Sequence, residues 1–98
     1  MYKMYKLDIQ NVPPQNKQPC LIEYYMVETQ GPGFPVYGIR IHFLSGSSIC
    51  SPIYVEEISN LSTSRYEVYQ LLCLCSRYQV TPTDLFSALD LLISHEQE

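Results

Sequence analysis

The chain has 98 residues, a length at which one hydrophobic core, and therefore a single domain over residues 1–98, is expected. Hydrophobic residues make up 46% of it and charged residues 16%, a composition that excludes an intrinsically disordered chain. Six basic residues stand against ten acidic ones, and the net charge of −4 argues against binding to nucleic acid or to an anionic membrane surface.

Neither a secretory leader nor a membrane-spanning segment is expected. The first ten residues, MYKMYKLDIQ, hold charges but no continuous apolar run. The longest apolar run, Leu71 to Cys75, is far too short to span a bilayer. A cytoplasmic location is therefore predicted, and the four cysteines are expected to be thiols rather than disulfides.

Two segments of the N-terminal half carry strand patterns. Residues 1–12 are compatible with a strand, and residues 20–28 predict one because they are rich in aliphatic and aromatic side chains. Prolines and glycines predict loops at residues 11–19 and 29–35. In the first segment the apolar residues that alternate with polar ones are Tyr5, Leu7 and Ile9.

The clearest strand, residues 36–44, is followed by a turn and by a returning strand at residues 48–58. A three-residue loop would pair Phe43 with Ile49, whereas a two-residue loop would oppose it with Ser48. The three-residue register is favoured because it buries more apolar side chains. It brings Ile39 opposite Ile53, Tyr37 opposite Val55 and His42 opposite Cys50.

The hydrophobic period changes to that of helices in the last third of the chain. Ser64 and Glu67 form a capping-box pattern that starts a helix ending near Tyr78. The sequence TPTD at residues 81–84 marks the start of a second helix in the same way. The first helix is expected to bury Val68, Leu71, Leu72, Cys75 and Tyr78, and the second Leu85, Ala88, Leu89 and Leu92.

These elements predict an α+β domain, an antiparallel sheet of three or four strands followed by two C-terminal helices packed on one face. The core is predicted where the helices meet the central strands. We expect Leu72, Leu85, Leu89 and Leu92 to lie buried against Ile39, Ile41 and Phe43.

Two helices joined by a tight link raise the alternative of a helix-turn-helix nucleic-acid binder. The second helix of such a motif presents basic and polar side chains to the major groove. Here that end carries Thr83, Asp84 and Ser87, and no Lys or Arg follows Arg77. The acidic charge disfavours this alternative, so the helix is predicted to fill a core.

Cysteine offers two further chemical possibilities. Cys73 and Cys75 would face directions about 200° apart on a helix, so they cannot share a metal ion. Cys50 beside His42 would be the start of a nucleophilic site, which makes a thiol enzyme the second functional hypothesis. The sequence indicates no group to orient the histidine and no oxyanion turn, so no catalytic, metal or cofactor-binding residue is predicted.

A second apolar strip lies opposite the buried face of the first helix. It consists of Tyr66, Tyr69 and Cys73, and we call it the tyrosine ridge. A small domain should not expose two apolar helix faces, so either a larger core or a partner covers the ridge. The ridge is the predicted interaction site, and an edge strand of the sheet is the alternative contact for a weak homodimer.

Three stretches carry a resemblance: YGIRI (37–41), EEIS (56–59) and VTPTDLFSALDLLI (80–93), the last of which opens on a V-x-P-x-x-L pattern. In this order they resemble a family of small domains of unknown function in Gram-positive anaerobes. Ser87 and Ala88 stand where that family prefers Asp and Val. The family has no assigned activity, so the resemblance supports the predicted fold and implies no function.

The sequence therefore predicts a small non-enzymatic protein-interaction or regulatory module that works without a cofactor. Its expected partner is another protein or a second copy of the chain, rather than nucleic acid or a membrane. The partner's identity and the biological process do not follow from the sequence.

Overall fold

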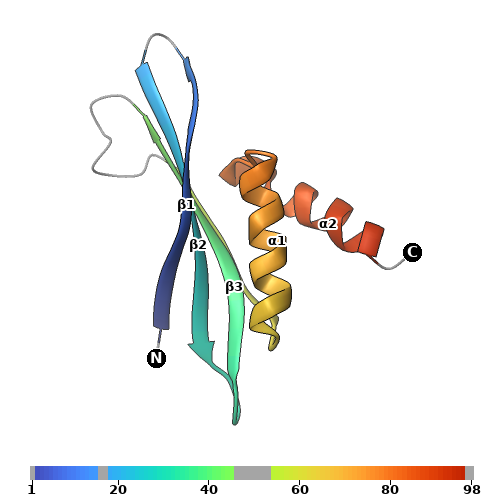
Figure 1. Ribbon diagram of the computed structural model, residues 1–98. Coiled ribbons are helices and arrows are strands. Elements are labelled where there is room, and N and C mark those ends of the chain that lie inside the picture. Colours follow the sequence, from blue (N-terminus) through green and yellow to red (C-terminus); the bar gives the residue numbers. More distant parts are fainter. Residues whose placement is uncertain (1, 16–17, 46–53, 97–98) are drawn as a thin grey trace.

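The computed structural model describes residues 2–15, 18–45 and 54–96, and it contains a four-stranded antiparallel sheet followed by two helices (Figure 1). The elements are β1 (Tyr2–Gln15), β2 (Gln18–Gln30), β3 (Pro35–Ser45), β4 (Tyr54–Ser62), α1 (Arg65–Arg77), the 3-10 helix η2 (Pro82–Asp84) and α2 (Leu85–Glu96). The strands are neighbours in chain order, and both helices lie on the same side of the sheet. The predicted α+β arrangement is therefore confirmed.

The two central strands bury apolar side chains on the face that α1 covers. In β2 the even-numbered Ile22, Tyr24 and Met26 are buried, and in β3 the odd-numbered Ile39 and Ile41 are fully buried. This alternation follows from strand geometry, in which successive side chains point to opposite faces. The residues between them form the open face of the sheet.

β1 changes face midway, because a register shift at Leu7 adds one residue to this strand. The shift places Asp8 on the helix-covered face, where its carboxylate accepts a short hydrogen bond from the Ser76 hydroxyl of α1. Ile9 is turned to the open face. The predicted uniform alternation of Tyr5, Leu7 and Ile9 is therefore wrong beyond Leu7, since a bulge inverts the order of the side chains that follow it.

The predicted loop at residues 11–19 is also wrong, because β1 and β2 form one long hairpin ladder. Their pairing reaches Gln15 and Gln18, with a second register shift just before Gln15. That shift contains Pro13 and Pro14, which lack a backbone N–H. An edge strand tolerates this loss because it has no neighbouring strand on its outer side. A proline whose nitrogen faces that side removes no hydrogen bond of the sheet.

β3 and β4 pair antiparallel as predicted, but in a different register. Phe43 pairs with Tyr54, five residues beyond the predicted Ile49. The predicted returning strand began at residue 48, and its residues 48–53 lie outside the described part of the chain. The tight-loop register was therefore wrong, and more chain separates the two strands than expected.

Cross-strand pairs account for the observed register. Ile39 faces Ile58, and Arg40 faces Glu57 with its Nη1 atom 3.1 Å from Glu57 Oε1. The predicted register maximised apolar pairs within one hairpin and did not include this pairing of opposite charges. Beyond these pairs β4 passes so close to Gly38 that a Cβ atom there would lie 2.2 Å from the Ile58 carbonyl oxygen. Only glycine permits this approach.

α1 begins at the predicted cap. Ser64 Oγ accepts a hydrogen bond from the Glu67 backbone N–H at 3.2 Å, whereas the Glu67 carboxylate accepts one from Ser62 Oγ at 3.0 Å. Tyr78, predicted in the core, is 65% exposed because α1 ends at Arg77 and the backbone leaves helical geometry there. The remaining residues of the predicted face are buried: Val68, Leu71, Leu72 and Cys75.

α2 contributes its first turns to the core. Leu85 and Leu89 join Leu72, Ile39 and Ile41 in one buried cluster, against which Phe43 packs, as predicted. The side chain of Leu92 lies outside the described part of the chain. The phenol of Tyr24 donates a hydrogen bond to the Val80 carbonyl at 3.0 Å and so fixes the link between the helices on the sheet. Neither described helix has the length and apolar composition needed to cross a membrane.

Candidate interaction surface

The tyrosine ridge lies on the side of α1 that points away from the core. Tyr66 is 66% exposed and Tyr69 is 46% exposed, so the core does not extend over these two rings. Cys73 is half-buried, and its thiol raises the pKa of the Tyr69 phenol through a hydrogen bond. Gln70 donates a hydrogen bond to the Tyr66 phenol oxygen at 2.7 Å. The three predicted interaction residues thus form one accessible strip.

A groove runs beside the ridge, between α1 and the edge strand β1. It consists of a hollow of about 190 Å³ and a second one of about 370 Å³, and Leu7 lines both. Tyr69 lines the first hollow and Cys73 the second, so ridge and groove form a continuous surface. We call it the α1–β1 groove. Its first hollow is mainly apolar and is also lined by Arg65, whereas its second hollow is lined mainly by polar side chains, namely Asp8, Gln10, Ser76 and Arg77.

Two guanidinium groups flank this groove without an ion pair. Arg65 lies 5.4 Å from the centroid of the Tyr5 ring, in a cation–π contact, and Arg77 is exposed at the end of α1. Among the described side chains, those of residues 2–11, 20–45 and 54–91, neither forms a salt bridge, whereas Lys6 is paired with Glu23 at 2.9 Å. The Asp8 carboxylate lines the second hollow together with Arg77, so the groove carries charges of both signs.

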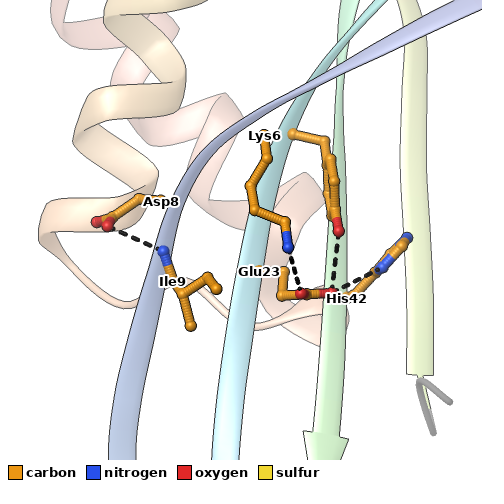
Figure 2. Close-up of polar contacts among 6 residues, drawn as sticks. Lys6, Asp8, Ile9, Glu23 and His42 are labelled. Carbon is orange, nitrogen blue, oxygen red and sulfur yellow. Dashed lines mark hydrogen bonds and ion pairs between the residues drawn. The ribbon is translucent and has the colours of Figure 1, made fainter. Parts of the chain in front are cut away.

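A polar network on the open face was not predicted from the sequence. Figure 2 shows Lys6 and His42 pointing toward Glu23, which binds Lys6 Nζ at 2.9 Å and His42 Nδ1 at 3.3 Å. Tyr25 donates to the same carboxylate at 3.0 Å, and Arg40 Nε donates to His42 Nε2 at 2.8 Å. The signal in the sequence is the alternation of Arg40 and His42 along one strand, which places both on one face.

The network leaves His42 little freedom for catalysis. One ring nitrogen faces Glu23, and the other accepts the hydrogen bond from Arg40. Burial lowers the pKa of His42, although the hydrogen bond to Glu23 acts in the opposite direction. A neutral imidazole whose acceptor nitrogen already binds a guanidinium has no lone pair available to take a proton from a nucleophile.

The predicted cross-strand pair of His42 and Cys50 is wrong. Val55 lies opposite His42, because the register of the hairpin differs from the predicted one, and Cys50 lies outside the described residues. Cys75 is fully buried, and burial raises the pKa of its thiol to about 11. This thiol and Cys73 lie on different sides of α1, and the described part of the chain contains no cluster of metal-ligating side chains.

One protein-family model matches the chain. Residues 6–95 match the family of unknown function DUF6514, which is most of the 98 residues. No curated protein and no solved structure matches the chain. The match confirms the part of the resemblance that concerns a domain of unknown function. The occurrence in Gram-positive anaerobes and the helix pattern stay predictions.

Proposed function

The chain belongs to the DUF6514 family of unknown function, and we propose that it is a small non-enzymatic protein-interaction or regulatory module that associates with a second copy of itself. The exposure of Tyr66 and Tyr69 on the tyrosine ridge carries this proposal. The opposite face of α1 is already buried in the core, so the ridge is not needed for folding.

Tyrosine suits a contact that both forms and dissociates. Its ring supplies a large apolar area with few rotatable bonds, and its hydroxyl remains compatible with water. A two-fold axis lets one apolar patch bury itself twice, against its own copy. Only 16% of the residues are charged, so few like charges oppose the approach of two copies.

The chemistry of the described side chains supports a non-enzymatic role. His42 is held between Glu23 and Arg40, and the raised pKa of Cys75 makes its thiol a poor nucleophile. Among the described side chains of α2, the exposed ones include Asp90 and no Lys or Arg, which supports a protein partner over nucleic acid or an anionic membrane. The thiols of Cys73 and Cys75 fit a cytoplasmic location.

Replacing Tyr66 and Tyr69 together by Ser tests the proposal. The double variant should stay folded and be monomeric in sedimentation velocity, because the exposed rings contribute to the contact and not to the core. Tyr78→Ser is the control, since this ring is as exposed as that of Tyr66 but lies off the ridge. A wild-type protein that sediments as a monomer at high concentration would rule out self-association.

A further inference from the structure

His42 lies within the polar network of the open face, and its two ring nitrogens have different partners. Nδ1 faces the Glu23 carboxylate at 3.3 Å (Figure 2), whereas Nε2 accepts a hydrogen bond from Arg40 Nε at 2.8 Å. An arginine N–H only donates, so the lone pair of the neutral ring lies on Nε2 and its proton lies on Nδ1. The contacts with Glu23 and Arg40 therefore select the Nδ1–H tautomer of His42.

The titratable groups connected to His42 come from all four strands. Among the described side chains they are Tyr2 and Lys6 of β1, Glu23 and Tyr25 of β2, Arg40 of β3 and Glu57 of β4. Lys6 pairs with Glu23 at 2.9 Å and Arg40 pairs with Glu57 at 3.1 Å. Two cations thus balance two carboxylates while the His42 ring is neutral, and a proton on the ring adds an unbalanced positive charge to the network.

Protonation of His42 has opposite effects on its two contacts. The contact with Glu23 becomes an ion pair and holds the ring more firmly. At the other nitrogen, a protonated Nε2 is a donor that faces the donor of Arg40, so the two groups can no longer form a hydrogen bond. The imidazolium and guanidinium charges also repel each other. The contact that breaks is therefore the one with Arg40.

We infer that the open face carries a proton-operated switch, in which one proton on His42 separates the Arg40 side chain from the ring and leaves it paired with Glu57. Arg40 is the part that moves, because its side chain is 31% exposed and that of His42 is 11% exposed. Burial lowers the pKa of His42 and the hydrogen bond to Glu23 opposes this shift, so the switch operates below pH 6.5. It requires no change in the strand pairing and does not depend on the proposed self-association.

Nuclear magnetic resonance of the isotope-labelled protein, titrated from about pH 8 to about pH 5, tests the inference. At the start of the titration, two-bond proton–nitrogen correlations should show His42 as the Nδ1–H tautomer. The Arg40 Nε–H resonance should then move toward that of the exposed Arg77, with the same midpoint as the protonation of His42. The backbone amide spectrum should remain that of a folded chain. An Nε2–H tautomer, an Arg40 resonance that does not follow His42, or unfolding at the His42 midpoint overturns the inference.

Two variants test the link between the ring and the guanidinium. Arg40→Met should raise the pKa of His42, because the neutral ring loses a donor and the protonated ring loses a like charge. Arg65→Met is the matched control, since it removes an equal charge outside the network and should leave the titration of His42 unchanged. In His42→Gln, whose amide does not titrate, the Arg40 Nε–H resonance should show no step over the same pH range. A step that persists in this variant, or an unchanged His42 midpoint in Arg40→Met, refutes the switch.

Discussion

The side chains of the sheet form two different faces. The apolar face packs against the helices, and on the open face polar side chains link neighbouring strands. On the first, Leu72 and Leu89 pack against the central strands. On the second, the Glu23 carboxylate joins Lys6 of β1 to His42 of β3, across the strand that lies between them. The two sets should respond to different perturbations: truncation on the apolar face and pH on the open face.

Leu89→Ala should lower the free energy of unfolding by about 2 to 5 kcal/mol. Leu89 is buried in the core cluster, so truncation removes apolar contacts and leaves a cavity. Leu91→Ala is the matched control on the same helix, and it should change stability by less than about 0.5 kcal/mol because Leu91 is exposed. Urea unfolding measures both. Equal midpoints for the two variants would mean that α2 docks through other residues.

Acidification below about pH 6.5 should destabilise the protein through His42. Burial lowers the pKa of His42 from its ordinary 6.5, so the unfolded chain binds a proton that the native protein resists. The free energy of unfolding therefore declines as the pH falls from 6.5 to the folded pKa. Unfolding midpoints measured against pH should show this decline, and His42→Gln should flatten it.

A second decline should follow below about pH 4.5, through Glu23. Burial alone would raise the pKa of this carboxyl, but hydrogen bonds from Lys6, Tyr25 and His42 hold it below its ordinary 4.5. Its contribution to stability is present above pH 4.5 and is lost as the pH falls through the folded pKa. A Glu23→Gln variant should lose this second step, and a curve identical to that of the wild type would contradict the assignment.

At the scale of elements, the two helices start with similar sequence signals but different local contacts. Ser64 Oγ accepts the Glu67 backbone N–H, so it satisfies one of the donors that a helix start leaves unpaired. Thr81 makes no such bond, and its hydroxyl donates to the Asp84 carboxylate at 3.0 Å. The second start is a 3-10 turn, η2, rather than the first turn of an α-helix.

Ser64→Ala should therefore lower the free energy of unfolding by about 0.5 to 2 kcal/mol, because it leaves the Glu67 N–H without its partner. Thr81→Ala should have a smaller effect, since the backbone amides of η2 receive no bond from this side chain. Thermal or urea unfolding of both variants under one set of conditions measures the difference. A larger loss for Thr81→Ala would contradict this ranking of the two caps.

The molecule as a whole is flat, with extents of 46 × 34 × 17 Å and a radius of gyration of 14.0 Å. A compact domain of this length has a radius of gyration of about 13 Å. A long hairpin covered on one side by a short helical layer explains the difference, as Figure 1 shows. The same arrangement leaves the α1–β1 groove and the tyrosine ridge accessible beside the edge strand.

Self-association predicts that the thermal midpoint of the wild type rises with protein concentration. A contact that forms between native chains and not between unfolded ones stabilises the native state by mass action. Tyr66→Ser with Tyr69→Ser should remove the dependence on concentration without unfolding the protein. Scanning calorimetry over a hundredfold range of protein concentration measures this dependence. Such a range changes the free energy by which association stabilises the native state by about 2.7 kcal/mol. A midpoint independent of concentration would show that the wild type melts as a monomer.

Local patterns in the sequence predicted the α+β class, the order of the elements, the start of α1, the buried face of β3 and, apart from Tyr78, the buried face of α1. These features depend on side-chain period and on caps, which act between residues a few positions apart. The tyrosine ridge followed from the same helical period.

Three features depend on tertiary contacts: the register of β3 and β4, the change of face in β1 and the contacts that join Glu23, Arg40 and His42. The register depends on interactions summed over the whole sheet, including the ion pair of Arg40 with Glu57. A local sequence pattern does not contain this sum. The bulge at Leu7 lets Asp8 reach Ser76 across 68 positions of sequence. Such contacts join residues that the sequence keeps far apart, so a local pattern cannot predict them.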